Sequence, residues 1–422
     1  MTPPFPTPVR AAYAIVVLTL LGFILTTDIT LTALLIEPMK RDMALSDMQV
    51  ALMQGTAYGL ALGFASLPMG RLIDRRSRRM LLTIGIVAWT GALVVIATAP
   101  SLWVVLAGRL MLGIVAALVV PATFSLGADL YAPARRSRAT SLLVVGQALG
   151  QGFGMFAGGK AFDALTRANI QPFGLAPWRV LYLMAAMLGV IVLVLLLGLR
   201  EPVRQERKAE QGKLSVALSQ IWQYREFLFP LIIGLLFAQV AIQAAAVWVS
   251  PLLIRRGLTP GMFAGWLSVI LLFAGVLGAL SGGWLAEVGR VRAGLTGALR
   301  PGALIALTMV PASLFAVAAP LPFFASLFAL HVFSGAIVAT IGIIAVTLVI
   351  PNDIRGLALG INTFAAAVFG AAGAPAGVAL ISDALGGENM LGVAVAALCV
   401  PSALLGAACL AAAGRAVLTN PR

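Results

Sequence analysis

The feature that most constrains this chain is a short arginine-rich loop between two long apolar runs. Residues 50–69 and 80–99 are almost entirely apolar, and each is about long enough to cross a bilayer as a helix, which takes roughly 20 residues. The loop between them, 70–79, carries five arginines and one aspartate, and such charges are costly to place in hydrocarbon. The chain is therefore expected to cross a membrane on both sides of this loop, with the arginines on the cytoplasmic face.

The composition places the whole chain in the same class. Of the 422 residues, 61% are hydrophobic and 10% are charged, whereas a soluble domain carries about 25% charged residues. The net charge of +14 does not indicate a nucleic-acid partner, because the charges are spread over short loops between apolar runs. We expect an all-α membrane protein that binds no nucleic acid.

Apolar runs of spanning length recur along the entire sequence, and they predict twelve transmembrane helices. The expected spans are 12–36, 50–70, 80–99, 102–128, 140–160, 178–199, 227–250, 262–286, 299–318, 322–349, 356–381 and 390–413. With the N-terminus inside, most lysines and arginines fall in the termini and the even-numbered loops. This bias predicts that both termini are cytoplasmic.

The longest loop divides the predicted spans into six and six. After a charged start it places Leu214, Leu218, Ile221 and Trp222 at helical spacing, which predicts a short helix lying on the membrane surface. We expect an N-terminal six-helix bundle at 1–199, a cytoplasmic linker at 200–226 and a C-terminal six-helix bundle at 227–422.

The two predicted bundles repeat each other weakly. Three pairs match in order: Gly70 and Asp74 with Gly283 and Glu287, Arg109 and Gly113 with His331 and Gly335, and Pro133 and Arg138 with Pro351 and Arg355. Many secondary transporters consist of two such related halves, with the substrate bound near the membrane midplane between them. The repeat predicts pseudo-symmetric bundles.

Asp28 and Arg109 are the charged residues placed deepest in predicted spans. Each lies roughly 10–12 Å below the outer surface when counted along its helix at 1.5 Å per residue. A charge there costs about 2.5–3.5 kcal/mol on insertion scales, so each must face the bundle interior and have a partner. We expect the two to pair and to couple transport to protons; a purely structural ion pair is the alternative.

Polar side chains on other spans form a second candidate set. Pairs four residues apart lie on one helix face, and an amide-and-aromatic lining suits a neutral polar or amphipathic solute. The expected substrate-binding residues are Gln54, Tyr58, Gln147, Gln151, Gln239, Gln243, Trp248, His331 and Asn362. For the amides the alternative is hydrogen bonding between helices, and for the lone histidine it is packing.

Charges at the cytoplasmic ends of the spans form a third set. Ion pairs there can hold a gate shut, and a gate needs only a few kcal/mol to be bistable. The expected gate residues are Gly70, Asp74, Arg75, Arg78, Asp129 and Arg138. Alternatively, these residues only set the topology of the helices.

These patterns resemble the major facilitator superfamily. The loop 70–79 is similar to the superfamily's loop between helices 2 and 3: a glycine, an acidic residue four positions on, then a basic cluster. Residues 146–159 resemble the antiporter motif of its exporters, except that Met155 stands where the motif has proline. Close helix packing alone is the alternative for that stretch.

Within the superfamily, the N-terminal third resembles the spinster-like group. The resemblance rests on Asp28, the stretch 35–47, the loop 70–79, and Arg109 followed by Pro121 and Asp129. The group usually has an arginine after the helix 1 aspartate and a buried glutamate on helix 4, where this chain has Ile29 and Ala116. The resemblance implies proton-linked or facilitated movement of amphipathic, sometimes lipid-like, molecules.

We therefore expect a secondary active transporter in a bacterial inner membrane that exports a small organic or lipid-like compound in exchange for protons. The sequence has no phosphate-binding loop of the Gly-x-x-x-x-Gly-Lys-Ser/Thr kind, and we expect no cofactor, no metal and no enzymatic activity. The expected partners are substrate, protons and membrane lipids, and the expected state is a monomer. An uncoupled facilitator, an uptake symporter and a transport-inactive sensor remain alternatives.

Overall fold

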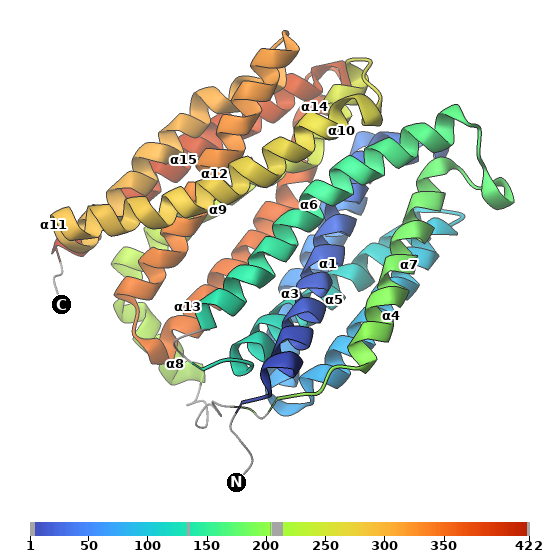
Figure 1. The fold of residues 1–422 in the computed structure, drawn as a ribbon. Helices are drawn as coiled ribbons and strands as arrows, with labels where there is room; N and C mark the ends of the chain where they lie inside the picture. Colours follow the sequence, from blue (N-terminus) through green and yellow to red (C-terminus); the bar gives the residue numbers. More distant parts are fainter. Residues whose placement is uncertain (1–4, 133–135, 203, 205–213, 420–422) are drawn as a thin grey trace. The chain divides into compact units, whose positions relative to one another are not determined.

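The computed structural model describes residues 5–132, 136–202, 204 and 214–419 (Figure 1). Within these residues all regular secondary structure is helical, as predicted. Clustering of contacts gives two compact units: unit 1 comprises 1–209 with 253–268, and unit 2 comprises 210–252 with 269–422.

The first half of the chain forms the helices of unit 1. In order they are α1 (Pro8–Asp42), α2 (Asp47–Ala51), the π turn η1 (Leu52–Thr56), α3 (Ala57–Arg75), α4 (Arg78–Ala97), α5 (Leu102–Asp129), α6 (Arg136–Arg167), the 3-10 turn η3 (Pro172–Gly174) and α7 (Pro177–Leu197).

The second half begins with α8 (Leu214–Gln223), which confirms a short helix in the predicted linker; residues 203 and 205–213 of that linker lie outside the described part. The later elements are α9 (Arg225–Arg255), α10 (Pro260–Val269), η4 (Ile270–Ala274), α11 (Gly275–Ala312), η5 (Ser313–Val317), α12 (Leu321–Val349), α13 (Asn352–Ala365), η6 (Ala366–Gly373), α14 (Ala374–Ala384), η7 (Glu388–Met390) and α15 (Leu391–Thr419).

Ten helical runs in the described residues are long and apolar enough to cross a membrane. One of them, Pro260–Val317, has 58 residues, far more than a single crossing needs. It is interrupted inside α11, where Ala293 and Gly294 leave helical geometry and Gly294 takes a positive φ of 63°. The 32-residue helix α6 is not among the ten.

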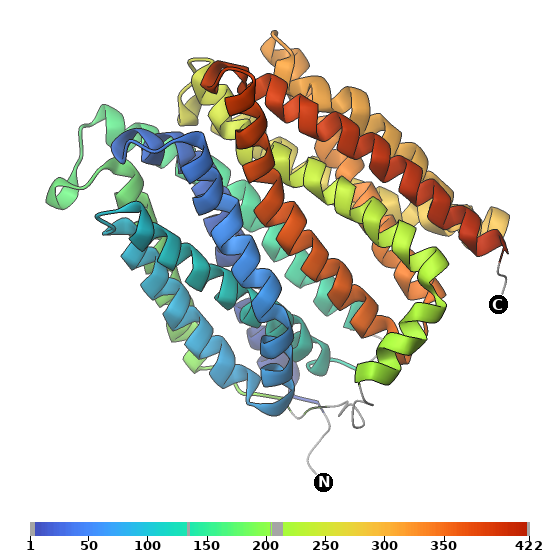
Figure 2. The same cartoon turned by 180° about the vertical axis from the view of Figure 1, so that it is seen from behind.

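Small residues set the spacing of α1 and α6, which lie side by side in Figures 1 and 2. A Cβ added to Gly146 would lie 2.5 Å from Thr19 Cγ2, and one added to Gly154 would lie 2.6 Å from the Thr27 carbonyl oxygen. Gly146, Gly150 and Gly154 follow one another at intervals of four residues, so they lie on one face of α6 and let the two backbones approach closely. This contact fixes the position of α1, which carries Asp28.

Two π turns interrupt spans that the sequence repeat makes equivalent. In η1 the amide of Ala57 donates to the carbonyl of Leu52, five residues earlier, and η4 lies in the corresponding span of the second half. A π turn widens the helix and frees a main-chain carbonyl from its usual partner, and such turns occur often at functional sites. In unit 1, main-chain carbonyls of η1 accept hydrogen bonds from Arg109.

Candidate functional site

Arg109 is the centre of the most buried polar cluster in unit 1. Its side chain is 1% exposed and lies one turn before Gly113, where a Cβ would come within 2.8 Å of the Ala61 side chain on α3. The guanidinium reaches the π turn η1: Nε donates to the Met53 carbonyl at 3.3 Å, and Nη2 donates to the Gln54 side-chain oxygen at 3.2 Å. Main-chain geometry in η1 thus supplies acceptors to a charge placed in the middle of a span.

A hydroxyl pair connects Arg109 to the helix that carries Asp28. Arg109 Nη1 donates to Thr32 Oγ1 at 3.1 Å, and the Tyr182 hydroxyl on α7 donates to the same oxygen at 2.8 Å. Thr32 in turn donates to the Asp28 main-chain carbonyl at 2.9 Å, with the Asp28 carboxylate further away at 3.4 Å. We call Asp28, Thr32, Gln54, Arg109 and Tyr182 the Arg109 cluster.

Asp28 itself is held loosely within this cluster. Its carboxylate lies 3.8 Å from Arg109 Nη1, beyond hydrogen-bond distance, although its side chain is almost fully buried. The other acceptors of Arg109 are neutral, and none of them is the Asp28 carboxyl. The arrangement can therefore gain or lose one charge without leaving the guanidinium unsatisfied.

The predicted polar residues of unit 1 divide into two sets. Gln54 belongs to the Arg109 cluster, and the Tyr58 ring lies 5.4 Å from the Arg109 guanidinium carbon in a cation–π contact. Gln147 and Gln151 lie on α6; the Gln147 carbonyl accepts from Thr26 at 2.7 Å, and the Gln151 side chain is exposed.

The predicted polar residues of unit 2 have different environments. Trp248 is fully buried and donates to the Pro375 carbonyl at 3.3 Å. His331 is 1% exposed, contacts Ser313 and the Ala241 carbonyl, and lies beside the Phe315 ring. Both therefore pack inside unit 2, whereas three side chains on α9 and α13 are partly exposed: Gln239, Gln243 and Asn362.

Among the predicted gate residues, Arg78 and Asp129 meet. Arg78 Nη1 lies 2.5 Å from the Asp129 carboxylate, and Nε lies 3.3 Å from Glu201, a residue that the sequence did not single out. Ser77 also donates to Glu201. Burial alone would raise the pKa of the Glu201 carboxyl, but the hydrogen bonds from Ser77 and Arg78 outweigh it and lower that pKa below its ordinary value. We call Ser77, Arg78, Asp129 and Glu201 the Arg78 cluster.

The other predicted gate residues do not join this cluster. Asp74 and Arg75 have exposed side chains, and the Asp74 carbonyl accepts from Arg204 of the linker. Gly70 has open space around it. Arg138 lies on α6, but its side chain is outside the described part of the structure.

Comparison with known proteins identifies the family. A family model described as the Major Facilitator Superfamily matches residues 18–313, well over half of the chain. The protein belongs to this superfamily. Its expected resemblance to that family is therefore confirmed.

Solved structures of facilitators share the fold. A bacterial homologue of the human lysosomal transporter Spinster, in an inward-facing and unoccupied conformation, matches with a TM-score of 0.79 and 20% identity, covering 99% of this chain and 100% of that one. The nucleoside transporter NupG matches with a TM-score of 0.71 and 15% identity over 94% of this chain and 99% of its own. At these identities the similarity establishes the fold, and the resemblance to the spinster-like group holds at that level.

A curated relative matches a smaller part of this facilitator. It is a triacylglyceride transporter of Mycolicibacterium hassiacum, 29% identical over 126 residues. The matched region covers 29% of this chain and 24% of the relative's length. The chain thus matches about a quarter of that relative.

The sequence analysis missed a second ionic cluster in this facilitator. Arg255 donates to Glu37 at 2.6 Å and to both carboxylate oxygens of Asp47 at 2.6 and 2.9 Å, while Lys40 lies 2.5 Å from Asp47. Glu37, Lys40 and Asp47 are each less than 9% exposed. We call Glu37, Lys40, Asp47 and Arg255 the Arg255 cluster. A signal was present: Glu37 and Lys40 lie on one face of a helix, three residues apart.

The same segment of α9 and α10 makes a second set of contacts in unit 1. Thr259 donates to Asp163 at 2.6 Å, and Lys160 donates to the Gly261 carbonyl at 3.0 Å. Residues 253–268 are thus tied to α1, α2 and α6, although the helices that continue from this segment belong to unit 2.

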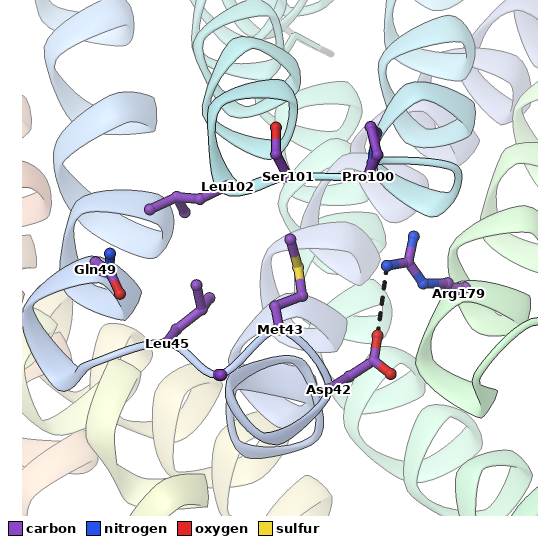
Figure 3. Close-up of a pocket in the computed structure, with 9 residues that line it drawn as sticks. Asp42, Met43, Leu45, Gln49, Pro100, Ser101, Leu102 and Arg179 are labelled. Carbon is purple, nitrogen blue, oxygen red and sulfur yellow. Dashed lines mark hydrogen bonds and ion pairs between the residues drawn. The ribbon is translucent and has the colours of Figure 1, made fainter.

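A surface pocket of about 530 Å³ lies near the end of α1 (Figure 3). Asp42 and Arg179 form an ion pair of 3.4 Å across it, and Gln49 and Ser101 add polar groups. Trp178 donates to Asp42 at 3.0 Å, and the Arg179 guanidinium also binds the carbonyls that end α4. These contacts tie α1 to the neighbouring helix ends, and we assign the pocket no ligand.

Proposed function

We propose that this facilitator is a secondary active transporter with twelve membrane-spanning helices in two pseudo-symmetric six-helix bundles. Two observations support a count above the ten apolar runs. The 58-residue run breaks at Ala293 and Gly294 into two limbs of spanning length, and α6 is long enough for a crossing, although glycines lower its hydropathy. Alternating access between two such halves is the mechanism that the superfamily membership favours.

The proposed coupling site is the Arg109 cluster, and the observation that carries the proposal is the 3.8 Å separation of Asp28 from Arg109. A proton taken up by the Asp28 carboxyl removes its negative charge, and with it the Coulomb attraction to the guanidinium. Arg109 remains bound to Thr32 and the η1 carbonyls in both protonation states. The protonation state of Asp28 therefore biases how α1 packs against α5 at little cost in unsatisfied donors.

Two ionic clusters are proposed as the gates. The Arg255 cluster ties residues 253–268 to α1 and α2, and it must open when those helices separate. The Arg78 cluster is the proposed cytoplasmic counterpart, and Gly70, Asp74, Arg75 and Arg138 stay predicted gate residues outside it. Both clusters are formed in the described structure, so each is proposed to hold its own end closed until it opens during the transport cycle.

The proposed substrate is a small organic or amphipathic, lipid-like compound. Gln147, Gln151, Gln239, Gln243 and Asn362 would provide hydrogen bonds without net charge. Tyr58 would contribute through its contact with Arg109, whereas the burial of Trp248 and His331 favours packing roles in the observed state. The relative that transports triacylglycerides is in keeping with an apolar or amphipathic cargo.

The direction and location are part of the same proposal. Export is favoured because residues 146–159 resemble the motif of the superfamily's exporters. The arginine-rich loops favour cytoplasmic termini, and we propose a bacterial inner membrane and a monomer.

The proposal is tested by flux in proteoliposomes that contain the full chain. Thermal-shift screening of lipids, drugs, sugars and organic acids first supplies a compound that binds. Transport of that compound should then depend on an imposed pH gradient. In Asp28→Asn the dependence on the gradient should be lost, while exchange of labelled for unlabelled compound continues.

Asp383→Asn is the matched control, because it removes an exposed carboxylate near the end of α14. It should retain the gradient dependence of the wild type. Gradient-driven transport that continues at the wild-type rate in Asp28→Asn would exclude Asp28 as the coupling residue. Binding without any transport, with or without a gradient, would favour a sensor.

A further inference from the structure

A groove in unit 2 lies between the second limb of α11 and the last turns of α15, which run beside each other in Figure 2. Its volume is about 290 Å³. Arg300 and Arg415 both line it, and both side chains are exposed. Across the part of the chain that the structure describes, neither arginine has an ion-pair partner. The groove therefore carries two cations and offers them no protein anion.

The inner end of the groove holds a polar group that is also unused. Thr296 lines the groove, is 7% exposed, and lies four residues before Arg300 on the same helix face. Among the described residues its hydroxyl makes no hydrogen bond. Its oxygen is not fully buried, so an anionic ligand in the groove can accept a hydrogen bond from it.

The remaining lining residues are apolar and lead away from the two arginines. Leu410, which is 6% exposed, and the neighbouring Ala303 form the floor, and Leu304 is 66% exposed beside them. Gly414 leaves the floor open where α15 passes α11. A matching ligand thus needs an anionic group at one end and a hydrocarbon part at the other.

We propose that this groove binds one anionic phospholipid. Its phosphate lies between Arg300 and Arg415 and accepts a hydrogen bond from Thr296, and an acyl chain follows Leu304 and Leu410. Basic pockets between helices at the cytoplasmic side of a membrane are sites for anionic headgroups. The proposal rests on the proposed topology, which puts the break at residues 293–294 and the C-terminal end of α15 at the cytoplasmic surface.

Charge complementarity alone would attract any anion, and the exposed leucine beside the arginines favours a lipid over free phosphate. An exposed Leu304 would face acyl chains in a bilayer, and only a lipid can occupy both ends of the groove. The Thr296 hydroxyl separates this groove from ordinary arginines at a membrane surface, because it adds a hydrogen-bond donor beside the two charges.

The test is native mass spectrometry of the full chain in detergent, titrated with dioleoyl phosphatidylglycerol, dioleoyl phosphatidylcholine or inorganic phosphate. We expect one phosphatidylglycerol to bind at least tenfold more tightly than phosphatidylcholine, and millimolar phosphate not to displace it. The double variant Arg300→Ala/Arg415→Ala should lose this preference, because each basic side chain contributes about 1 kcal/mol near an anionic surface.

Thr296→Val is the sharper variant, because it keeps both charges and the side-chain shape. We expect it to weaken phosphatidylglycerol binding about threefold to tenfold, the effect of losing one ordinary hydrogen bond. Arg292→Ala is the matched control, since Arg292 is exposed near the same break but does not line the groove. It should bind the lipid as the wild type does.

Equal binding of the two lipids, displacement by phosphate, or wild-type binding by Thr296→Val would each overturn the proposal. The measurement needs no pH gradient and no transported compound. Asp28→Asn should retain the bound lipid, so loss of coupling and loss of the lipid site are distinguishable.

Discussion

Arg78 and Arg109 lie in the same unit and are almost equally buried, at 2% and 1% exposed, yet they differ in how closely carboxylates bind them. Arg78 contacts two carboxylates, Asp129 at 2.5 Å and Glu201 at 3.3 Å, and also donates to the carbonyl and hydroxyl of Ser125. Arg109 has one carboxylate at 3.8 Å and otherwise donates to hydroxyl, amide and main-chain oxygens.

The difference shows what each arrangement can do. A guanidinium that depends on close carboxylates loses most of its stabilisation when one of them is removed or protonated, because the remaining charge is buried and uncompensated. A guanidinium held by neutral acceptors keeps its partners when its carboxylate changes charge. The Arg78 cluster is thus suited to holding helix ends together, and the Arg109 cluster is suited to a change of protonation.

The largest expected effect comes from Arg78→Ala. It leaves Asp129 and Glu201 without their cation, and breaking a buried pair in this way costs about 3–5 kcal/mol. The free energy of unfolding in mixed micelles should fall by that amount. Arg75→Ala, which removes an exposed arginine from the same loop, should leave it nearly unchanged. A small effect of Arg78→Ala would mean that the close carboxylates of Arg78 contribute little to the free energy of unfolding.

Arg255→Ala is expected to act on the conformational equilibrium. Hydrogen bonds to charged groups contribute about 1.5–3 kcal/mol, and Arg255 donates to both Glu37 and Asp47. Their loss should increase the labelling rate of a cysteine introduced by Ser268→Cys, a position that is 8% exposed, at least tenfold, because residues 253–268 would separate from α1 and α2 more often. Arg256→Ala is the control with a neighbouring exposed arginine. Unchanged labelling in Arg255→Ala would show that the cluster does not act as a gate.

Thr32→Val tests the neutral acceptors around Arg109. The change keeps the side-chain shape but removes the oxygen that both Arg109 and Tyr182 use, so we expect a loss of about 1–3 kcal/mol in unfolding free energy. Thr30→Val is the control, because its hydroxyl bonds only the Thr26 carbonyl of its own helix. In a double-mutant cycle, Thr32→Val and Tyr182→Phe should be non-additive. Additive losses would mean that the two hydroxyls act independently.

Much of this arrangement follows from the sequence. The positions of Asp28 and Arg109 at equal depth in apolar runs predict their proximity, because each is too costly to leave unpartnered. Most helices follow the predicted apolar runs, but α11 covers parts of two predicted spans and α8 lies in the predicted linker. The depth of each charge along its span predicts the pairing of Asp28 with Arg109, and the apolar runs predict the order of the spans.

The rest depends on geometry that a linear pattern does not encode. The carbonyls freed at η1 need a π turn, and nothing in residues 52–56 marks one. Thr32 and Tyr182 belong to the Arg109 cluster because α1, α5 and α7 meet there, and hydroxyls are common on apolar spans. Arg255 is far from Glu37 in sequence, so their contact appears only in the fold.

Asp28→Asn should affect stability much less than Arg78→Ala, although it is expected to abolish coupling. The carboxylate is 3.8 Å from Arg109 and 3.4 Å from Thr32, so a neutral amide of the same shape gives up little. We expect unfolding free energies within about 1 kcal/mol of the wild type, the contribution of one ordinary hydrogen bond. A loss as large as that of Arg78→Ala would place Asp28 among the structural ion pairs.

The smallest expected effect is the pH dependence contributed by Glu201 in the Arg78 cluster. Hydrogen bonds from Ser77 and Arg78 lower the pKa of the folded Glu201 carboxyl relative to the unfolded chain. Its stabilising contribution is therefore fully present above the ordinary pKa of a glutamate and is lost as the pH falls through the lowered value. Thermal unfolding followed from neutral to acidic pH should show a shallower acid loss in Glu201→Gln than in the wild type, and Asp74→Asn should follow the wild type. If Glu201→Gln kept the wild-type slope, the carboxyl would contribute nothing to the cluster, and Asp129 alone would account for the tight pairing of Arg78.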